Sequence, residues 1–511
     1  MCGIVGILQP SSLSGEAGVT LRSMAGTLRH RGPDDEGIWM DERAGVGLGH
    51  RRLSILDLSP AGHQPMMSAD GRYVIVFNGE IYNFEQLRSE LESAPLPQSS
   101  LARGEGSSIR WRGHSDTEVM LEAVSRWGLE AAVQRFNGMF AFALWDRETQ
   151  TLSLGRDRLG EKPLYYGWAG QTFLFASELK ALRAYPGFKE DVDRDALTLF
   201  LRYGYIPAPH CIFRGLRKLP PGMLLTVRAD DAGHEPTPAP YWSLKDVVER
   251  GTAVPFKGSD DDAVAQLDEL LRDAVKLRMV ADVPLGAFLS GGIDSSTVVA
   301  LMQAQSGRPV KTFSIGFHED GYNEATFAGA VARHLGTDHT ELYVTPVEAR
   351  DVIPRLPALY DEPFADSSQI PTFLVSELAR RQVTVSLSGD GGDEVFGGYN
   401  RYFLGQRLWN GIRWMPKPVR RGLGNTLRAF SPRTWNALFH RAAPLLPGSV
   451  KVQHPGDKLQ KLADLLTVDD PRMLYWGLVS LWKNPADVVI GATEPVTVFN
   501  EVHHRTNLTD F

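Results

Sequence analysis

The first two residues could carry out nucleophilic chemistry. Cys2 directly follows Met1, so removal of Met1 would leave a thiol and a free α-amino group on one residue. An unperturbed thiol has a pKa of about 8.5 and an α-amino group about 7.7–8.0, so the neutral amine can accept the thiol proton near neutral pH. A cysteine at this position can equally be a small buried apolar residue, and position alone leaves both interpretations open.

Four polar clusters interrupt the apolar segments that follow Cys2. An enzyme that hydrolyses glutamine needs such groups: a guanidinium for the α-carboxylate, a carboxylate for the ammonium, and amide donors for the oxyanion. Asn-Gly at the end of an apolar run can supply both donors, although singly each of these residues is more often a turn or a solvated surface group. The clusters are RHRGPDDEG (29–37), GHRRLSI (49–55), FNGEIYN (77–83) and HSDTE (114–118).

Taken in order behind Cys2, these motifs resemble the class II, N-terminal-nucleophile glutamine amidotransferase domain. The motifs that carry the resemblance are MCGIVGI, RHRGPD, HRRLSI, FNGEIYN and SDTE. The resemblance implies that Cys2 is nucleophile and general base, and that Asn78 and Gly79 form the oxyanion hole. It also implies that Arg52 binds the glutamine carboxylate, Asp116 binds its ammonium and Glu80 lies in the same pocket. His30 and the RHRGPD loop are interpreted as mainly structural.

The second half of the chain contains two further polar loops. Ser290–Ser296 (SGGIDSS) lies between an apolar run and a helical stretch, where glycines and backbone N–H groups can form an anion pocket. This loop lacks the lysine of a Walker A motif, which favours a leaving pyrophosphate as the bound group. Ser388–Glu394 (SGDGGDE) holds three carboxylates that could bind Mg²⁺, position an amine, or form a solvated turn.

SGGIDSS is similar to the pyrophosphate loop of ATP pyrophosphatases, and together with LSGDGGDEVFGGY it resembles asparagine synthetases. The resemblance implies glutamine, aspartate and ATP as substrates and Mg²⁺ as cofactor, with Asp294 and Asp393 holding Mg²⁺–pyrophosphate. Asp390 would take the acidic position needed for a β-aspartyl-AMP intermediate. The motif DEPFADSSQIP (361–371) resembles a stretch near the acceptor site without fixing the acceptor. The implied ATP-binding residues are Leu289, Ser290, Gly291, Gly292, Asp294, Ser295, Ile315, Ser388 and Gly389.

The expected reaction is therefore ATP-dependent synthesis of asparagine with ammonia from glutamine, through a Cys2 thioester and β-aspartyl-AMP, giving glutamate, AMP and pyrophosphate. Two alternatives stay open. A related amidotransferase would amidate another carboxylate. A glutaminase-only or non-catalytic protein would use its second half as an assembly module.

The predicted elements divide the chain into two parts. In the first, residues 1–205, strands at 3–8, at 73–77 and four more within 139–178 alternate with helices at 16–29 and 116–127, which predicts an α+β N-terminal-nucleophile sandwich (αββα). The run at 73–77 is predicted to break into a tight turn at Asn78-Gly79. Ser93–Gly113 is interpreted as a flexible insertion, without an assigned function.

Residues 206–255 form a predicted Pro-rich linker, and 256–511 an α/β domain of the ATP-pyrophosphatase type. There, alternating strands and helices predict a parallel sheet with ligands at the carboxyl ends of its strands. The resemblance is expected to end near Arg401, which predicts that this second domain is incomplete at its C-terminus.

The composition and charge of the chain are those expected of a soluble intracellular enzyme. The net charge of −7 gives no basic surface for nucleic acid, and two cysteines predict no disulfide framework. No apolar run approaches the roughly 18 residues that span a bilayer, and no signal peptide is recognisable. We expect a cytoplasmic protein with no nucleic-acid or membrane partner, and a homodimer is compatible with the sequence.

Overall fold

The computed structural model describes residues 1–13, 15–93, 109–318, 323–442, 455–468 and 470–497. The chain forms two compact units, one comprising residues 1–193 and 206–389, the other residues 194–205 and 390–511. Most of the predicted insertion, residues 94–108, lies outside the described residues.

The first unit begins with two six-stranded antiparallel sheets, and aliphatic and aromatic side chains fill the space between them. Their strand orders are β10-β8-β9-β1-β3-β2 and β12-β11-β7-β6-β5-β4. The strands are β1 (Gly3–Leu8), β2 (Asp35–Asp41), β3 (Val46–Arg52), β4 (Met66–Met67), β5 (Tyr73–Ile81), β6 (Gly138–Asp146), β7 (Thr151–Arg156), β8 (Tyr165–Ala169), β9 (Thr172–Ala176), β10 (Leu216–Lys218), β11 (Met223–Val227) and β12 (Ala239–Pro240).

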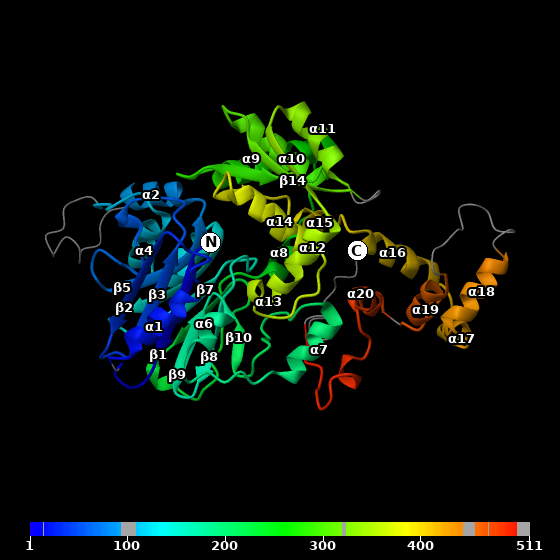
Figure 1. The fold of residues 1–511 in the computed structure, drawn as a ribbon, viewed down its shortest axis with the longest axis horizontal. Coiled ribbons are helices and arrows are strands. Elements are labelled where there is room, and N and C mark those ends of the chain that lie inside the picture. The colour runs from blue at the N-terminus through cyan, green and yellow to red at the C-terminus, as the bar shows by residue number, and fades with distance from the viewer. Residues whose placement is uncertain (14, 94–108, 319–322, 443–454, 469, 498–511) are drawn as a thin grey trace. The chain divides into compact units, whose positions relative to one another are not determined.

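Helices cover the outer face of each sheet (Figure 1). Helices α1 (Ala17–Gly26) and α6 (Leu179–Arg183) pack on the sheet that contains β1. Helices α2 (Phe84–Ser93), α4 (Asp116–Trp127) and α5 (Leu129–Arg135) bury their apolar faces against the sheet that contains β5. The layers follow the order helix, sheet, sheet, helix, which confirms the predicted αββα sandwich.

Strand β5 corrects the prediction of a turn at Asn78-Gly79. The strand continues to Ile81, with Asn78 opposite Ala141 and Gly79 opposite Phe140 of β6. A Cβ atom on Gly79 would lie only 2.7 Å from the Cα of Phe140. The glycine therefore permits close approach of a neighbouring strand, a role that the dipeptide alone does not distinguish from a turn.

Part of the predicted linker belongs to the sheets. Residues 216–218 pair with β8 and residues 224–227 pair with β7, so β10 and β11 extend one sheet each. The chain crosses between the sheets through Pro220-Pro221-Gly222, where Gly222 has a φ of +69°. Prolines and glycines in this stretch mark turns between short strands. Helix α8 (Leu244–Ala253) follows.

The first unit also contains the predicted parallel sheet, which is confirmed with the order β15-β14-β13-β16. Apolar residues of α9, α10 and α11 pack on one side of it, and α14 packs against Phe313 of β14. Its elements are α9 (Asp260–Arg278), β13 (Leu285–Phe288), α10 (Ile293–Gln305), β14 (Lys311–Phe317), α11 (Ala325–Leu335), β15 (Asp338–Val344), α12 (Pro346–Val352), α13 (Leu356–Leu359), α14 (Gln369–Arg380) and β16 (Val385–Leu387).

The second unit is helical around a small apolar core of Ile412, Leu466 and Leu474. Helix α7 belongs to it, because the buried Arg202 pairs with Glu494 and donates to the carbonyl oxygens of Trp482 and Lys483. Its described helices are α7 (Arg194–Tyr203), α15 (Gly392–Phe396), α16 (Asn400–Ile412), α17 (Lys417–Arg428), α18 (Pro432–Ala442), α19 (Pro455–Leu465) and α20 (Pro471–Val479).

Candidate active site

Cys2 lies at the start of β1 against the end of β3. Its carbonyl oxygen accepts a hydrogen bond of 2.8 Å from Nε of Arg31. Its sulfur lies 3.4 Å from the backbone N–H of Leu53, which donates to it. Burial raises the pKa of the Cys2 thiol, so the thiolate depends on neighbouring donors and on a nearby base.

A cavity of about 300 Å³ opens beside Cys2. Every residue predicted for the glutaminase site lines it, so the fold brings together positions that are more than 100 residues apart in the chain. Residues 384–386, at the start of β16 in the parallel sheet, form another part of the wall. The predicted residues in the lining are Cys2, Arg52, Asn78, Gly79, Glu80 and Asp116, and further lining residues include Met1, Leu53, Ile55, Leu56, Gly62, Gln64, Phe77, Ser115, Thr117, Met139 and Lys162.

Asn78 is fully buried in β5 and contributes to this cavity. Neither its side-chain oxygen nor its side-chain nitrogen has a hydrogen-bond partner among the residues that the structure describes. Buried amides are normally paired, so an unpaired one at a cavity wall indicates a ligand that pairs with it. The amide N–H₂ is suited to an oxyanion that forms beside Cys2.

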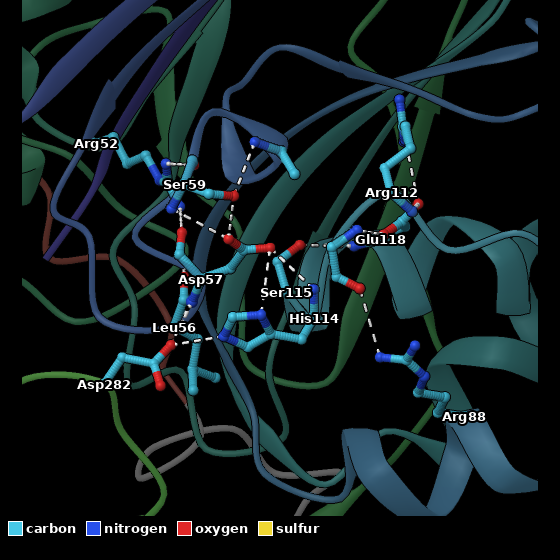
Figure 2. A network of polar contacts seen from close by, with 12 residues as sticks. Arg52, Leu56, Asp57, Ser59, Arg88, Arg112, His114, Ser115, Glu118 and Asp282 are labelled. Carbon is cyan, nitrogen blue, oxygen red and sulfur yellow. Dashed lines mark hydrogen bonds and ion pairs between the residues drawn. The ribbon is translucent and has the colours of Figure 1, made fainter.

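Arg52 ends β3 and its guanidinium is held by backbone carbonyls (Figure 2). It donates to the oxygens of Ser59 at 3.1 Å and Leu56 at 3.4 Å, and also to that of Asp57. Neutral carbonyls orient the guanidinium without neutralising it. Within the described part of the chain, no carboxylate forms an ion pair with Arg52, which leaves its charge for a bound anion.

Two carboxyl groups lie elsewhere in the cavity wall. Asp116 begins α4, behind the capping Ser115, and accepts a 2.9 Å hydrogen bond from the N–H of Ile81. Burial raises the pKa of Asp116 to about 6. Burial and the nearby Asp116 raise the pKa of Glu80 to about 7. A bound ammonium would favour the charged form of both, so these carboxyls fit the ammonium of an amino acid.

Three residues of the site were not assigned a role from the sequence. Arg31 contacts the nucleophile and lies within the RHRGPD loop, which was interpreted as structural. Gln64 accepts from the N–H of Phe77 at 2.6 Å and donates to Thr117, which joins β5 to α4. Lys162 is buried beside Met1, and burial lowers its pKa. Gln64 and Lys162 lie in no recognisable motif, and only the fold brings them to Cys2.

The predicted nucleotide loop follows β13 and begins α10. Gly291 has a φ of +82°, and Gly292 is the N-cap residue of α10. The hydroxyls of Ser290 and Ser295 lie 3.0 Å apart and brace the loop, and Asp294 lies in the first turn of the helix. Strand, loop and helix N-terminus together give the arrangement expected of a phosphate site.

The carboxyl end of β16 meets this loop. A Cβ atom on Gly389 would lie 2.7 Å from the backbone nitrogen of Ser295. The segment Ser388-Gly389 that follows β16 therefore brings Gly389 into close contact with the nucleotide loop. Leu289 is 1% exposed and packs in the apolar core, and its N–H already donates to Phe313. Ile315 packs beside Val344 and Val352.

Asp390 and Asp393 fall in the second unit, after Gly389 and within α15 respectively. No group of three or more His, Cys, Asp or Glu residues could hold a metal ion within the described ranges. Asp294 and Asp393 are therefore not part of an all-protein metal cage there.

Two known protein families match this chain, one in each half. A family described as "Glutamine amidotransferase domain" matches residues 1–242, and one described as "Asparagine synthase" matches residues 266–500. The second match continues beyond Arg401, where the resemblance was expected to end. The prediction that the resemblance ends near Arg401 is therefore wrong, because the helices in this part carry no short motif that marks them as belonging to the family.

The chain is also similar to curated proteins. It is 39% identical to a putative glutamine-hydrolysing asparagine synthetase 2 of Methanocaldococcus jannaschii, over 82% of this chain and 79% of that protein. It is 37% identical to glutamine-hydrolysing asparagine synthetase 1 of Bacillus subtilis, over 79% of this chain but only 59% of that protein. It is 30% identical to a Gibberella zeae protein named amidase chry2, over 79% of this chain and 60% of that protein. Among the described residues, none of the helices has the length and apolar character needed to cross a membrane.

Proposed function

The chain belongs to the family of glutamine-hydrolysing asparagine synthetases, and from this premise we propose that it makes asparagine from aspartate and ATP with ammonia released from glutamine. The observation that carries the proposal is the cavity beside Cys2. It combines a nucleophile, an unpaired buried amide, a guanidinium held only by neutral carbonyls and two carboxyls with a wall formed by β16.

In the glutaminase half, the Cys2 thiolate attacks the amide carbon of glutamine. Arg52 binds the α-carboxylate, and Asp116 and Glu80 face the ammonium. The Asn78 amide and the Gly79 N–H stabilise the oxyanion, which collapses to a thioester as ammonia leaves. Removal of Met1 frees the α-amino group of Cys2 to accept the thiol proton and to donate it to the leaving amine. Water then attacks the thioester and releases glutamate.

The ammonia would pass along the wall that the two halves share. Residues 384–386 line the glutamine cavity, and beyond the end of β16 the chain continues through Ser388 to Gly389 at the nucleotide loop. The strand β16 and the two residues after it therefore connect the cavity wall to the nucleotide loop. Ammonia that stays beside this strand keeps out of bulk water, where it would be protonated.

In the synthetase half, the β-carboxylate of aspartate attacks the α-phosphorus of ATP, and pyrophosphate leaves. Ammonia then attacks the acyl carbon of β-aspartyl-AMP, and AMP leaves with asparagine as product. The N–H groups and hydroxyls of Ser290–Ser295 bind the pyrophosphate. Asp294 beside such a loop fits Mg²⁺, which is commonly held by one or two carboxylates together with phosphate oxygens and which neutralises their charge when bound. The roles of Asp393 in Mg²⁺ binding and of Asp390 at the acyl-adenylate stay predictions from the sequence motif.

A second candidate acceptor is a carboxylate other than aspartate. The similarity to a protein named amidase favours this alternative, since that relative is matched over both halves of the present chain. The glutaminase chemistry would be the same, and only the acceptor would differ. For either acceptor, we propose a cytoplasmic location, which suits a nucleophilic Cys2 thiol that must stay reduced.

The test is mass spectrometry of the products formed from amide-¹⁵N-glutamine, aspartate and Mg-ATP. Labelled asparagine with AMP in equal amount is the expected result. Labelled ammonia and glutamate without asparagine would contradict the synthetase and favour another acceptor, which a panel of carboxylates in the same assay would identify. No glutamate at all would contradict the glutaminase as well.

A further inference from the structure

Asp282 connects the segment before β13 to the loop that holds Arg52 (Figure 2). Its carboxylate oxygen Oδ2 accepts a 2.8 Å hydrogen bond from the N–H of Asp57 and lies 2.7 Å from Nε2 of His114. Its own N–H donates to the carbonyl of Ile55 at 2.9 Å. Asp282 therefore contacts the loop at residues 55 and 57 and, through His114, the segment that precedes α4.

Asp57 is the residue through which these contacts reach the guanidinium. Its N–H is bound by Asp282, and its carbonyl oxygen accepts from Arg52. Its carboxylate accepts from the N–H groups of Ser59 at 3.1 Å and His114 at 2.9 Å. The side chain is 1% exposed, and every hydrogen-bonding part of the residue is engaged in the same network.

The backbone of Asp57 adopts a left-handed conformation, and these contacts hold it in place. Its φ is +54°, in the left-handed region that L residues other than Gly, Asn and Asp rarely adopt. Such a conformation persists where the surroundings over-determine it. In this conformation the carbonyl of Asp57 points at Arg52 while its N–H points at Asp282.

The hydrogen bond from His114 keeps the Asp282 carboxyl ionised. The hydrogen bond from His114 holds the pKa of the Asp282 carboxyl below its usual value. The other charged groups in contact with Asp282 or Asp57 are Asp57 itself, whose pKa is lowered, despite burial, by hydrogen bonds from Ser59 and His114, and Arg52. A carboxylate that accepts from two donors is a stronger anchor than a neutral side chain in the same place.

We propose that Asp282 and His114 are positioning residues for glutamine binding: they fix Asp57 in its left-handed conformation and thereby hold the Arg52 guanidinium toward the substrate carboxylate. The inference rests on the proposed glutaminase and adds to it a contribution from the parallel-sheet half. Neither residue lines the cavity, so their effect is on the binding of glutamine and not on the attack by Cys2.

The experiment is steady-state glutaminase kinetics on the full chain, with glutamine affinity measured separately by calorimetry. Asp282→Ala and His114→Ala should each raise KM and Kd for glutamine about tenfold and leave kcat within about twofold. His114→Gln, whose amide can reach the place of Nε2, should restore most of the affinity. Asp268→Asn, an exposed acid of α9 paired with Arg272, is the matched control and should change nothing.

The double variant separates positioning from a general structural effect. Asp282→Ala combined with His114→Ala should be no worse than either single change, because both act through Asp57. Unchanged KM and Kd in Asp282→Ala would overturn the inference, as would a parallel fall in kcat and in ammonia-dependent synthesis. A wild-type chain that binds glutamine without releasing glutamate would overturn the proposed glutaminase, and the Kd values would still decide the positioning role.

Discussion

Nε of Arg31 lies 2.8 Å from the carbonyl oxygen of Cys2, and the same guanidinium donates from Nη1 to Glu178 at 2.7 Å. Arg31 thus fixes the backbone of the nucleophile, and Glu178, the N-cap residue of α6, fixes Arg31. His30 and Lys180 also contact Glu178. Through Arg31, the RHRGPD loop therefore positions the backbone of Cys2.

Glu178→Gln is expected to destabilise the fold in a pH-dependent way. Burial opposes the charge of Glu178, but the contacts from His30, Arg31 and Lys180 outweigh it and lower its pKa to about 2. A lowered carboxyl pKa stabilises the fold above the unfolded value of about 4.3, by about 3 kcal/mol, and this contribution is lost as the pH falls toward 2. Urea unfolding at several pH values measures it. As a control, Glu190→Gln removes an exposed ion pair with Arg183 and should lower the free energy of unfolding by less than about 1 kcal/mol. If Glu178→Gln lowered the free energy of unfolding equally at pH 7 and at pH 3, the stabilising role of the Glu178 charge would be contradicted.

Gly62→Ala is expected to weaken glutamine binding. A Cβ atom at this position would fall on the Arg52 guanidinium, which must then move away from its carbonyl partners. We expect KM for glutamine to rise about tenfold with a smaller change in kcat. Gly26→Ala in α1, where the added methyl meets no atom within 4 Å, is the control. Equal KM values for the two variants would show that Arg52 does not bind the substrate.

The glutaminase should lose efficiency in mild acid. The Asp116 and Glu80 carboxyls have pKa values raised to about 6 and about 7, and they bind the substrate ammonium only when ionised. As the pH falls from 8 to 6, Glu80 becomes mostly protonated and Asp116 about half protonated, so kcat/KM for glutamine should fall while kcat at saturation changes less. Glu80→Gln should move the fall to lower pH. A profile that is the same in Glu80→Gln and in the wild-type chain would exclude Glu80 from this role.

Cys2→Ala should abolish glutamine-dependent asparagine formation. Synthesis from added ammonium chloride should persist at a rate within about threefold of the wild-type rate, because the nucleotide loop does not contact Cys2. Product analysis with either nitrogen source measures both activities. Loss of the two reactions together would contradict separate sites.

Asp294→Asn should impair the synthetase reaction and leave the glutaminase reaction intact. Glutamate release should continue, while AMP formation should fall about 100-fold or more, since a carboxylate beside the phosphate loop is replaced by a neutral amide. Asp338→Asn, at the exposed start of β15, serves as the control. Unchanged AMP yield in Asp294→Asn would refute its assigned role.

Much of the fold and the site could be predicted from local patterns. Alternating apolar runs and helical spacing identify β1, α4 and the strands from β6 to β9. Cys2, FNGEIYN and SGGIDSS are short motifs whose residues act together within a few positions of the chain, so their chemistry can be recognised without coordinates. Strand–loop–helix order places the nucleotide loop at the edge of a parallel sheet for the same reason.

The remaining features of the fold and the site depend on contacts between residues that are far apart in the sequence. Gly79 looks like a turn residue until β6 is seen to pass beside it, and Pro220-Pro221-Gly222 looks like a linker until β10 and β11 join the sheets. The hydrogen bond between Arg31 and Cys2, and those of Asp282 with Asp57, link residues 29 and 225 positions apart. Sequence patterns report local periodicity and short motifs, whereas burial, strand neighbours and the orientation of a guanidinium arise only when distant segments pack together.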